Sequence, residues 1–196
     1  MKRNTFTLIE ILGVLVVIAI LATLGFAGYS YANNKSKESA TQGLITRLGA
    51  AFEVAQQKSG FIPPSGNNYV QLGVTNETVT IGSDVIHVKE SENDSLPGGD
   101  KPRTRKMYAA FCKNFIQSLQ MDSMSRFIEN GVIVDAWGNP VRFRYPGVLK
   151  TGGFDLIAAG SDGGFGSGSP AADDPSGTMS DYRDGNEWIC DDIANF

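Results

Sequence analysis

The sequence predicts an α+β protein in which a long N-terminal helix packs on a small antiparallel sheet. An almost unbroken apolar run over residues 6–26 begins the chain. Apolar residues then recur at helical spacing over 44–55 and 107–128, and strand-like alternation follows over 132–159. The 196 residues leave room for one membrane helix and one modest globular domain. A net charge of −4 argues against nucleic acid as a partner.

The apolar run has the length and the flanking charges of a membrane-crossing helix. Residues 11–29 lie at the lower end of the length that a helix needs to span a bilayer. Lys2 and Arg3 precede the run, and after Glu10 the next charge is Lys35. Because positive residues favour the cytoplasmic side, we expect a cytoplasmic N-terminus and an exported remainder.

Glu10 is the only ionisable residue in this run, and a carboxylate at the edge of hydrocarbon is costly unless it meets a partner. The segment Phe6-Thr7-Leu8-Ile9-Glu10 resembles the N-terminus of type IV pilins and type II secretion pseudopilins. The resemblance implies that residues 1–5 are a short leader, cut between Thr5 and Phe6 by a prepilin peptidase, and that Phe6 is then methylated. It also implies that Glu10 meets the N-terminal amine of a neighbouring subunit and sets the stagger between subunits. Thr5 stands where the family has Gly.

Two simpler interpretations of the apolar run stay open. It is compatible with a secretory signal that ends at the small-x-small sequence Ser30-Tyr31-Ala32, or with a plain single-pass anchor. Glu10 fits poorly in either, because neither needs a carboxylate inside the apolar segment.

The helix is expected to continue beyond the membrane, from about Thr7 to Ser59, over roughly 80 Å. Residues 6–30 form the membrane half and residues 31–60 the periplasmic half. Gly60 and the prolines that follow it end the helix. One face of the second half carries the predicted core stripe: Leu44, Leu48, Ala51, Phe52 and Ala55.

Residues 61–196 are predicted to form the globular domain. A helix is expected over about 107–129, strands over about 132–159, and an acidic loop over 160–196. Short strands are also expected around Val79 and Val85. Cys112 and Cys190 could form a disulfide in an exported domain, or stay free with Cys112 in the core.

The charge is unevenly distributed in this domain. Residues 101–150 carry nine basic and three acidic residues, whereas residues 151–196 carry Arg183 against nine acids. The basic run over residues 101–106 is therefore expected to meet the acidic region 151–196 of a neighbouring subunit.

The second half of the chain resembles the major pseudopilin of type II secretion. Four segments and the end of the chain carry this resemblance: Asp135-Ala136-Trp137-Gly138-Asn139-Pro140, Arg144-Tyr145-Pro146-Gly147, Phe154-Asp155-Leu156, Gly160-Ser161-Asp162-Gly163 and Asp192-Ile193-Ala194-Asn195-Phe196. The resemblance implies a pilin-like fold with a calcium-binding C-terminal loop. It also implies a structural subunit of a periplasmic pseudopilus, anchored once in the bacterial inner membrane with its C-terminal domain in the periplasm.

The acidic loop has the composition of a calcium site. Ca²⁺ takes oxygen ligands in loose geometry, and clustered acids repel one another unless a cation lies between them. The resemblance implies one Ca²⁺, held by the side chains of Asp162 and Asp192 and by the carbonyl of Ala159, with Ser161 and Asp191 as weaker candidates. The alternative is a solvated acidic loop.

The expected partners follow from the same resemblance. They are copies of the chain itself, minor pseudopilins, the inner-membrane assembly platform, the prepilin peptidase, and membrane lipid before extraction. An enzyme is not expected, because the chain has no nucleophile elbow, phosphate loop or metal-ligand histidines. Two other functions stay open: a type IV pilus or minor pilin-like subunit, and a membrane-anchored calcium-dependent binding module.

Overall fold

The structure is a computed structural model that describes residues 8–88, 102–167, 175, 179–184, 187–188 and 190–196. It divides the chain into two compact units, Met1–Lys37 and Glu38–Phe196. The first helix, α1 (Leu8–Ser59), contributes its N-terminal part to the first unit and its C-terminal part to the second. Its bounds agree with the helix predicted from about Thr7 to Ser59.

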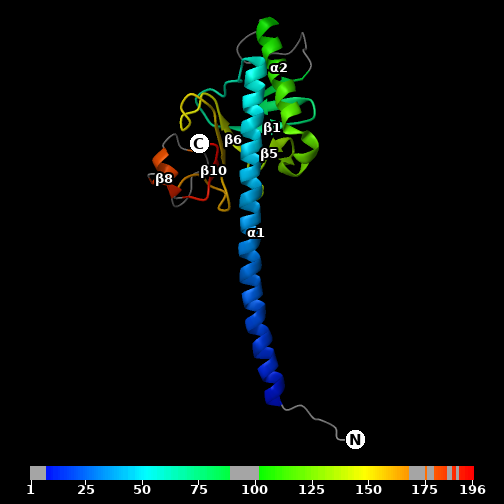
Figure 1. Cartoon of the computed structure of the whole chain (residues 1–196), viewed down its shortest axis with the longest axis vertical. Coiled ribbons are helices and arrows are strands. Elements are labelled where there is room, and N and C mark those ends of the chain that lie inside the picture. Colours follow the sequence, from blue (N-terminus) through cyan, green and yellow to red (C-terminus); the bar gives the residue numbers. More distant parts are fainter. Residues whose placement is uncertain (1–7, 89–101, 168–174, 176–178, 185–186, 189) are drawn as a thin grey trace. The chain divides into compact units, whose positions relative to one another are not determined.

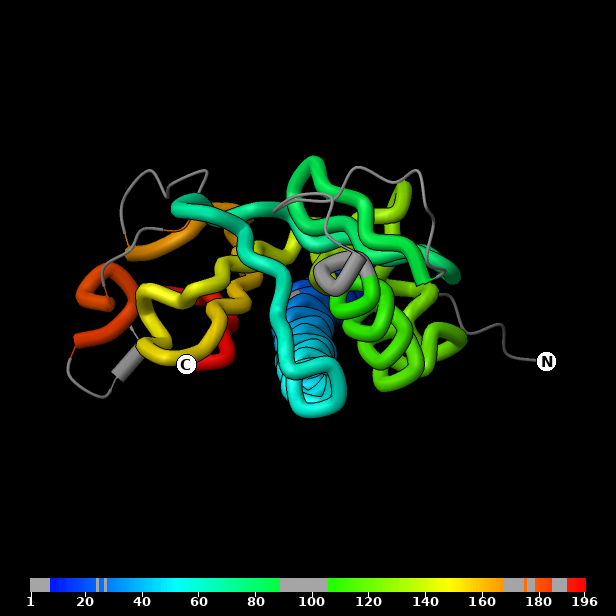
Figure 2. Tube along the Cα trace, turned by 90° about the horizontal axis from the view of Figure 1, so that it is seen from above, coloured from blue at the N-terminus to red at the C-terminus, as the bar shows by residue number. Residues whose placement is uncertain are grey.

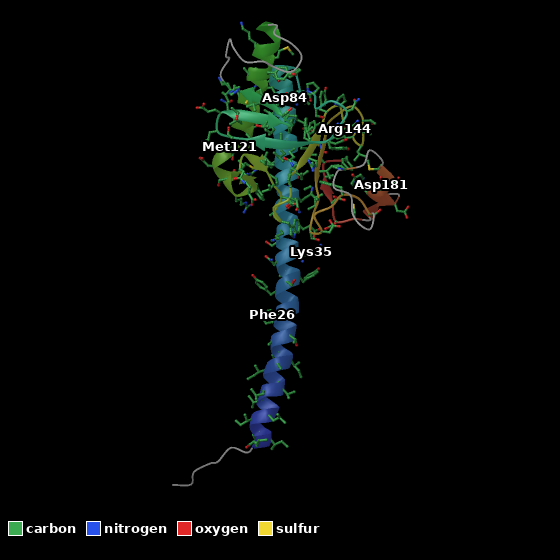
Figure 3. All side chains as sticks on the ribbon, turned by 180° about the vertical axis from the view of Figure 1, so that it is seen from behind. Phe26, Lys35, Asp84, Met121, Arg144 and Asp181 are labelled. Carbon is green, nitrogen blue, oxygen red and sulfur yellow. The ribbon has the colours of Figure 1, made fainter. Side chains whose placement is uncertain are left out.

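The first unit consists of the N-terminal part of α1, whose described apolar side chains are all exposed. Phe26, for example, is 77% exposed and projects away from the helix (Figure 3). Among the described residues, α1 is the one helix that is long and apolar enough to cross a membrane. An apolar surface around a whole helix is typical of a segment that has lipid or other helices as its surroundings.

The second unit buries one stripe of α1, as predicted. Leu44, Leu48 and Phe52 are at most 2% exposed, and they pack against the sheet and α2 (Pro102–Leu119). Figures 1 and 2 show that α1 lies between α2 and the C-terminal segments in this unit. The helix ends where Gly60 adopts a φ of +69°, a conformation that glycine tolerates without strain, and the Gly60 amide closes the last turn on the Gln56 carbonyl at 2.7 Å.

The sheet is antiparallel, with the path β10-β7-β6-β1-β2-β3 and with β4 and β5 paired beside β1. Its strands are β1 (Val70–Val74), β2 (Thr78–Ile81), β3 (Asp84–His87), β4 (Ile128–Glu129), β5 (Val132–Ile133), β6 (Arg142–Arg144), β7 (Asp155–Ala158) and β10 (Ile193–Ala194). The strands β8 (Arg183–Asp184) and β9 (Glu187–Trp188) form a separate two-stranded antiparallel sheet. The alternating segments between 132 and 159 thus form antiparallel strands, as expected.

The second helix differs from its predicted range of about 107–129. It begins at Pro102 and ends at Leu119, because Gln120 adopts a left-handed φ of 52° that an α-helix cannot continue through. The apolar residues beyond it belong to two 3₁₀ turns, Met121–Ser123 and Ser125–Phe127, which keep nearly the same spacing on a tighter helix.

The sheet separates two apolar clusters. Leu156 and Ala158 of β7 contribute to the cluster that holds α1 and α2, whereas Ile157 and Ala159 contribute to a second cluster with Tyr182. Because side chains alternate along a strand, the two clusters lie on opposite faces. The second face is therefore covered by the C-terminal segment that also carries the acidic residues.

The two cysteines do not form the disulfide that the sequence left open. Both are free; Cys112 lies in the first cluster, and Cys190 packs against the second. The Cys112 thiol donates to the Ile86 carbonyl at 3.1 Å, and burial raises its pKa to about 12.

Candidate functional site

Asp191, a predicted metal ligand on the C-terminal segment, contacts the loop that follows β7 and carries Asp162, another predicted ligand. One oxygen of Asp191, Oδ2, accepts hydrogen bonds from the Ser161 amide at 2.6 Å, the Ser161 hydroxyl at 2.7 Å and the Asp162 amide at 3.0 Å. Asp162 in turn accepts the Gly164 amide at 2.9 Å. Both carboxylates are exposed and serve first to shape the loop.

Gly160 begins this loop and has no room for a side chain. Its φ is +73°, and a Cβ there would collide with the Asp191 carbonyl oxygen. Ala159, the residue before it, is 1% exposed and belongs to the second apolar cluster. The chain thus leaves the buried strand and enters the acidic loop through one tightly packed glycine.

Asp192 differs from its two acidic neighbours because it is buried, with 5% of its surface exposed. Its Oδ2 accepts the Gly166 amide at 2.7 Å, and its Oδ1 makes no hydrogen bond of standard geometry, although the Cys190 thiol lies near the carboxylate. Burial raises the pKa of Asp192 to about 6, and the negative charges of Asp191 and Asp162 add to the effect. The Cys190 thiol and the Gly166 amide act in the opposite direction.

A buried carboxylate oxygen without a partner is costly, and a cation is one way to satisfy it. Hard cations such as Ca²⁺ prefer oxygen ligands of this kind. Within the described part of the chain, no group of three or more His, Cys, Asp or Glu side chains is assembled as a metal site. The buried Oδ1 of Asp192 is thus an oxygen that a cation would satisfy, and the metal site itself stays a prediction.

The turn after β5 contains a second buried carboxylate, Asp135, which is 2% exposed. Its Oδ1 accepts the amides of Trp137 at 2.8 Å and Asn139 at 2.9 Å. Burial raises its pKa, and the hydrogen bonds from the turn partly oppose that rise. Asp135 thus fixes the shape of the turn.

Two polar residues connected to this turn have an individual role that the sequence did not indicate. Thr41 on α1 is fully buried and accepts the Ala136 amide at 3.1 Å. The Asn139 side-chain amide donates to the Gly160 carbonyl at 2.9 Å, and so joins the turn to the acidic loop. Thr41 lies three residues before Leu44, on the same helix face as the buried stripe, but its polar side chain by itself favours solvent exposure.

A third missed residue is Asp155 of β7, which is fully buried. It accepts the hydroxyl of Tyr69 at 2.9 Å and the amides of Val148, Leu149 and Lys150 at 2.8 to 3.1 Å. A carboxylate with this many donors is satisfied within the protein. Asp155 is therefore a structural residue that holds the loop before β7 in place.

The predicted assembly residues lie apart from the acidic loop in the sequence. Glu10 is exposed in the first turn of α1, within the first unit. Thr5 and Phe6, the predicted processing and methylation positions, lie outside the described residues.

Comparisons with protein-family models, with curated proteins and with solved structures gave no match. The function proposed below therefore rests on the residues of this chain and on their geometry.

Proposed function

We propose that this protein is a structural subunit of a periplasmic filament, the pseudopilus of a type II secretion system. The observation that carries the proposal is the contrast within α1, which presents an apolar surface with one carboxylate, Glu10, and then packs on a globular domain. An apolar helix of this kind is stable in lipid and also in the core of a bundle of identical helices. The resemblance of residues 6–10 to pilin N-termini supports the core of a helix bundle as the final environment of this segment.

In this proposal the inner membrane stores the subunit, and extraction moves α1 from lipid into the filament core. Glu10 then sets the register by meeting the N-terminal amine of the neighbouring copy, because a buried charge is tolerated only when it is paired. The prepilin peptidase, the minor pseudopilins and the assembly platform are the further partners.

Filament formation by Glu10 variants tests this proposal. Full-length wild type, Glu10→Leu and Glu10→Asp would be produced together with a complete type II assembly machinery, and sheared filaments would be counted by electron microscopy. Glu53→Gln, an exposed change in the second half of α1, is the matched control. We expect filaments from the wild type and the control and none from Glu10→Leu.

The outcomes separate the alternatives. Filaments of normal abundance from Glu10→Leu would refute the register role. Long filaments on the cell surface would favour a type IV pilus subunit. A calcium-dependent binding activity that persists in Glu10→Leu, without filaments from the wild type, would favour the membrane-anchored binding module.

The acidic loop would hold one Ca²⁺ in this subunit, through the side chains of Asp192 and Asp162 and the carbonyl of Ala159. Asp191 and Ser161 bind each other in the structure, so they serve the site mainly by shaping the loop. The ion would supply a compensating charge for the buried carboxylate and stabilise the fold.

Thermal unfolding of the full chain in detergent micelles tests the metal. Calcium at about a hundred times its dissociation constant adds roughly 2.7 kcal/mol to the free energy of unfolding. For a protein of this size that raises the melting temperature by about 5–10 °C over a chelated sample. The rise should disappear in Asp192→Asn and persist in Asp122→Asn, an exposed change outside the loop. Equal melting temperatures with calcium and with chelator would contradict the metal site.

A further inference from the structure

Asn139 lies between the turn that packs on α1 and the acidic loop. Its Nδ2 donates to the Gly160 carbonyl at 2.9 Å and lies 3.4 Å from Asp135 Oδ2. Its backbone amide donates to Asp135 Oδ1, so the residue is held by the same carboxylate that shapes the turn. One side chain thus contacts both structural elements.

The loop is fixed at the point where Asn139 contacts it. Gly160 packs directly on the backbone of Asp191, and the next two amides donate to the Asp191 carboxylate. A Cβ on Gly163 would lie 3.4 Å from Asn139 Oδ1, so the side chain also packs along the loop. A shift of Gly160 would therefore be transmitted to the segment that carries Asp162.

The turn on the other side is fixed to α1. The buried Thr41 hydroxyl accepts the Ala136 amide, and both residues belong to the second unit. Hydrogen bonds therefore connect α1 to the turn, and Asn139 connects the turn to Gly160. The loop runs on from Gly160 to Gly166, whose amide donates to Asp192.

We propose that Asn139 is a positioning residue for the cation of the acidic loop, and that it couples cation binding to the turn packed on α1. This inference rests on the proposed calcium site, which it extends from the ligands to a residue that does not touch the ion. Binding pulls Asp162 and Asp192 into one arrangement, and Asn139 holds the beginning of the loop in the matching position. Coupling between two sites is reciprocal, so the ion in turn restrains the 135–139 turn.

The size of the effect follows from what such residues do at other metal sites. Loss of a hydrogen bond that orients a ligand typically weakens metal affinity by about 10–100-fold. Asn139 acts on a backbone carbonyl at the start of the loop rather than on a ligand side chain. We therefore expect a change of about tenfold, at the lower end of this range.

Calcium titration calorimetry of the full chain in detergent micelles tests the inference. Asn139→Leu keeps the approximate size of the side chain and removes the donor, and Asn67→Leu makes the same change at an exposed position. We expect the calcium dissociation constant to rise about tenfold in Asn139→Leu and to stay at the wild-type value in Asn67→Leu.

A purely structural role gives a different result. The melting temperature of Asn139→Leu would then fall equally with and without calcium, while its dissociation constant stayed unchanged, and the inference would be overturned. If the wild type itself binds no calcium, the metal site fails and the inference fails with it. The two failures are thus distinguishable in the wild-type titration.

Hydrogen exchange on the wild type provides a measurement that needs no variant. Calcium should slow exchange of the amides in residues 135–139 as well as in 160–166. Slower exchange confined to 160–166 would overturn the coupling, even if Asn139→Leu does not fold.

Discussion

The two parts of α1 are both rich in apolar residues, yet they have opposite environments. Before residue 38, large apolar side chains such as Ile18 and Phe26 are more than half exposed. After it, Leu48, Phe52 and Ala55 are fully buried against the sheet and α2. The difference lies in the pattern around the helix. An apolar surface on every side cannot be covered by one domain, whereas a single stripe can.

This comparison shows that apolar content alone does not assign a helix to a core or to a membrane. The second part of α1 has charged residues on its exposed face, and its buried face fits four aromatic rings around Phe52: Phe111, Phe115, Phe143 and Phe154. The buried polar residues Thr41, Asp135, Asp155 and Asp192 also all belong to the second unit. Specific side-chain contacts therefore determine the structure of the second unit, whereas the first unit is characterised only by its apolar composition.

The largest difference should appear when one apolar side chain is truncated in each part. Phe52→Ala removes the ring at the centre of the aromatic cluster and should lower the free energy of unfolding by about 3–5 kcal/mol. Leu15→Ala, at a position 58% exposed, should leave the domain unchanged. Urea denaturation of the full chain in detergent, followed by tryptophan fluorescence, measures both. Similar losses in the two variants would contradict the division of α1.

An added charge should be harmful in the first part of α1 and tolerated in the second, which is the reverse of the effect of truncating an apolar side chain. Ile18→Arg places a guanidinium in the apolar run and should cost about 3 kcal/mol in membrane insertion. Ala50→Arg adds the same charge to an exposed position of the second part and should have little effect. The fraction of protein that resists alkaline extraction from membranes is the measurement. If Ala50→Arg is released as readily as Ile18→Arg, the first part is not the membrane segment.

A change of pH should act on the second unit through its buried carboxylates. The pKa of Asp192 in the folded state, about 6, exceeds its ordinary value of 3.8, so the folded protein binds this proton more tightly than the unfolded chain. Without calcium, the free energy of unfolding should therefore be highest near pH 4. It should fall as the pH rises toward 6 and then level off, by at most about 3 kcal/mol.

Asp192→Asn should remove most of this slope, and Asp135, whose pKa is also raised, should supply a remainder of the same sign. Calcium should oppose the decline, because the ion binds the ionised carboxylate. Denaturation curves at pH 4, 5, 6 and 7 in chelator would measure the slope. An unchanged slope in Asp192→Asn would show that this carboxylate is not the buried group responsible.

The smallest effect concerns two threonines on the second part of α1. Thr41→Val leaves the Ala136 amide without its acceptor and should cost about 1–2 kcal/mol. Thr46→Val removes an exposed hydroxyl that bonds only to the Gln42 carbonyl of its own helix, and should change stability by less than about 0.5 kcal/mol. Equal costs would mean that the bond from α1 to the turn contributes nothing specific.

Much of the fold could be predicted from local pattern. The bounds of α1, its buried stripe and the strands after residue 132 follow from local sequence pattern, which depends only on neighbouring residues. The end of α2 could not be predicted, because a 3₁₀ turn continues an apolar spacing almost as an α-helix does. Strand β1 was missed as well: it lies in a region of weak alternation, and its pairing with β2, β5 and β6 creates it.

The candidate site also has a part that the sequence predicted and a part that it did not. Composition placed the acids in one loop, but it could not distinguish the exposed Asp162 and Asp191 from the buried Asp192. It also gave no role to Asn139, because the partner of its amide, Gly160, lies across the fold in a different segment. The hydrogen-bond partner of a side chain is determined by the tertiary structure, whereas the sequence gives only the chemical type of the side chain.

The sequence by itself determined the long helix, the change in its pattern near residue 40, and the acidic character of the C-terminal segment. These features depend on residue type and spacing, which hydrophobic burial and backbone geometry turn directly into local structure. Only the tertiary structure decided that Thr41 meets Ala136, that Asn139 meets Gly160, and that Asp192 keeps one buried oxygen unpartnered. Such contacts join segments distant in sequence, and close packing of the whole domain selects them from many pairings that local preference allows equally.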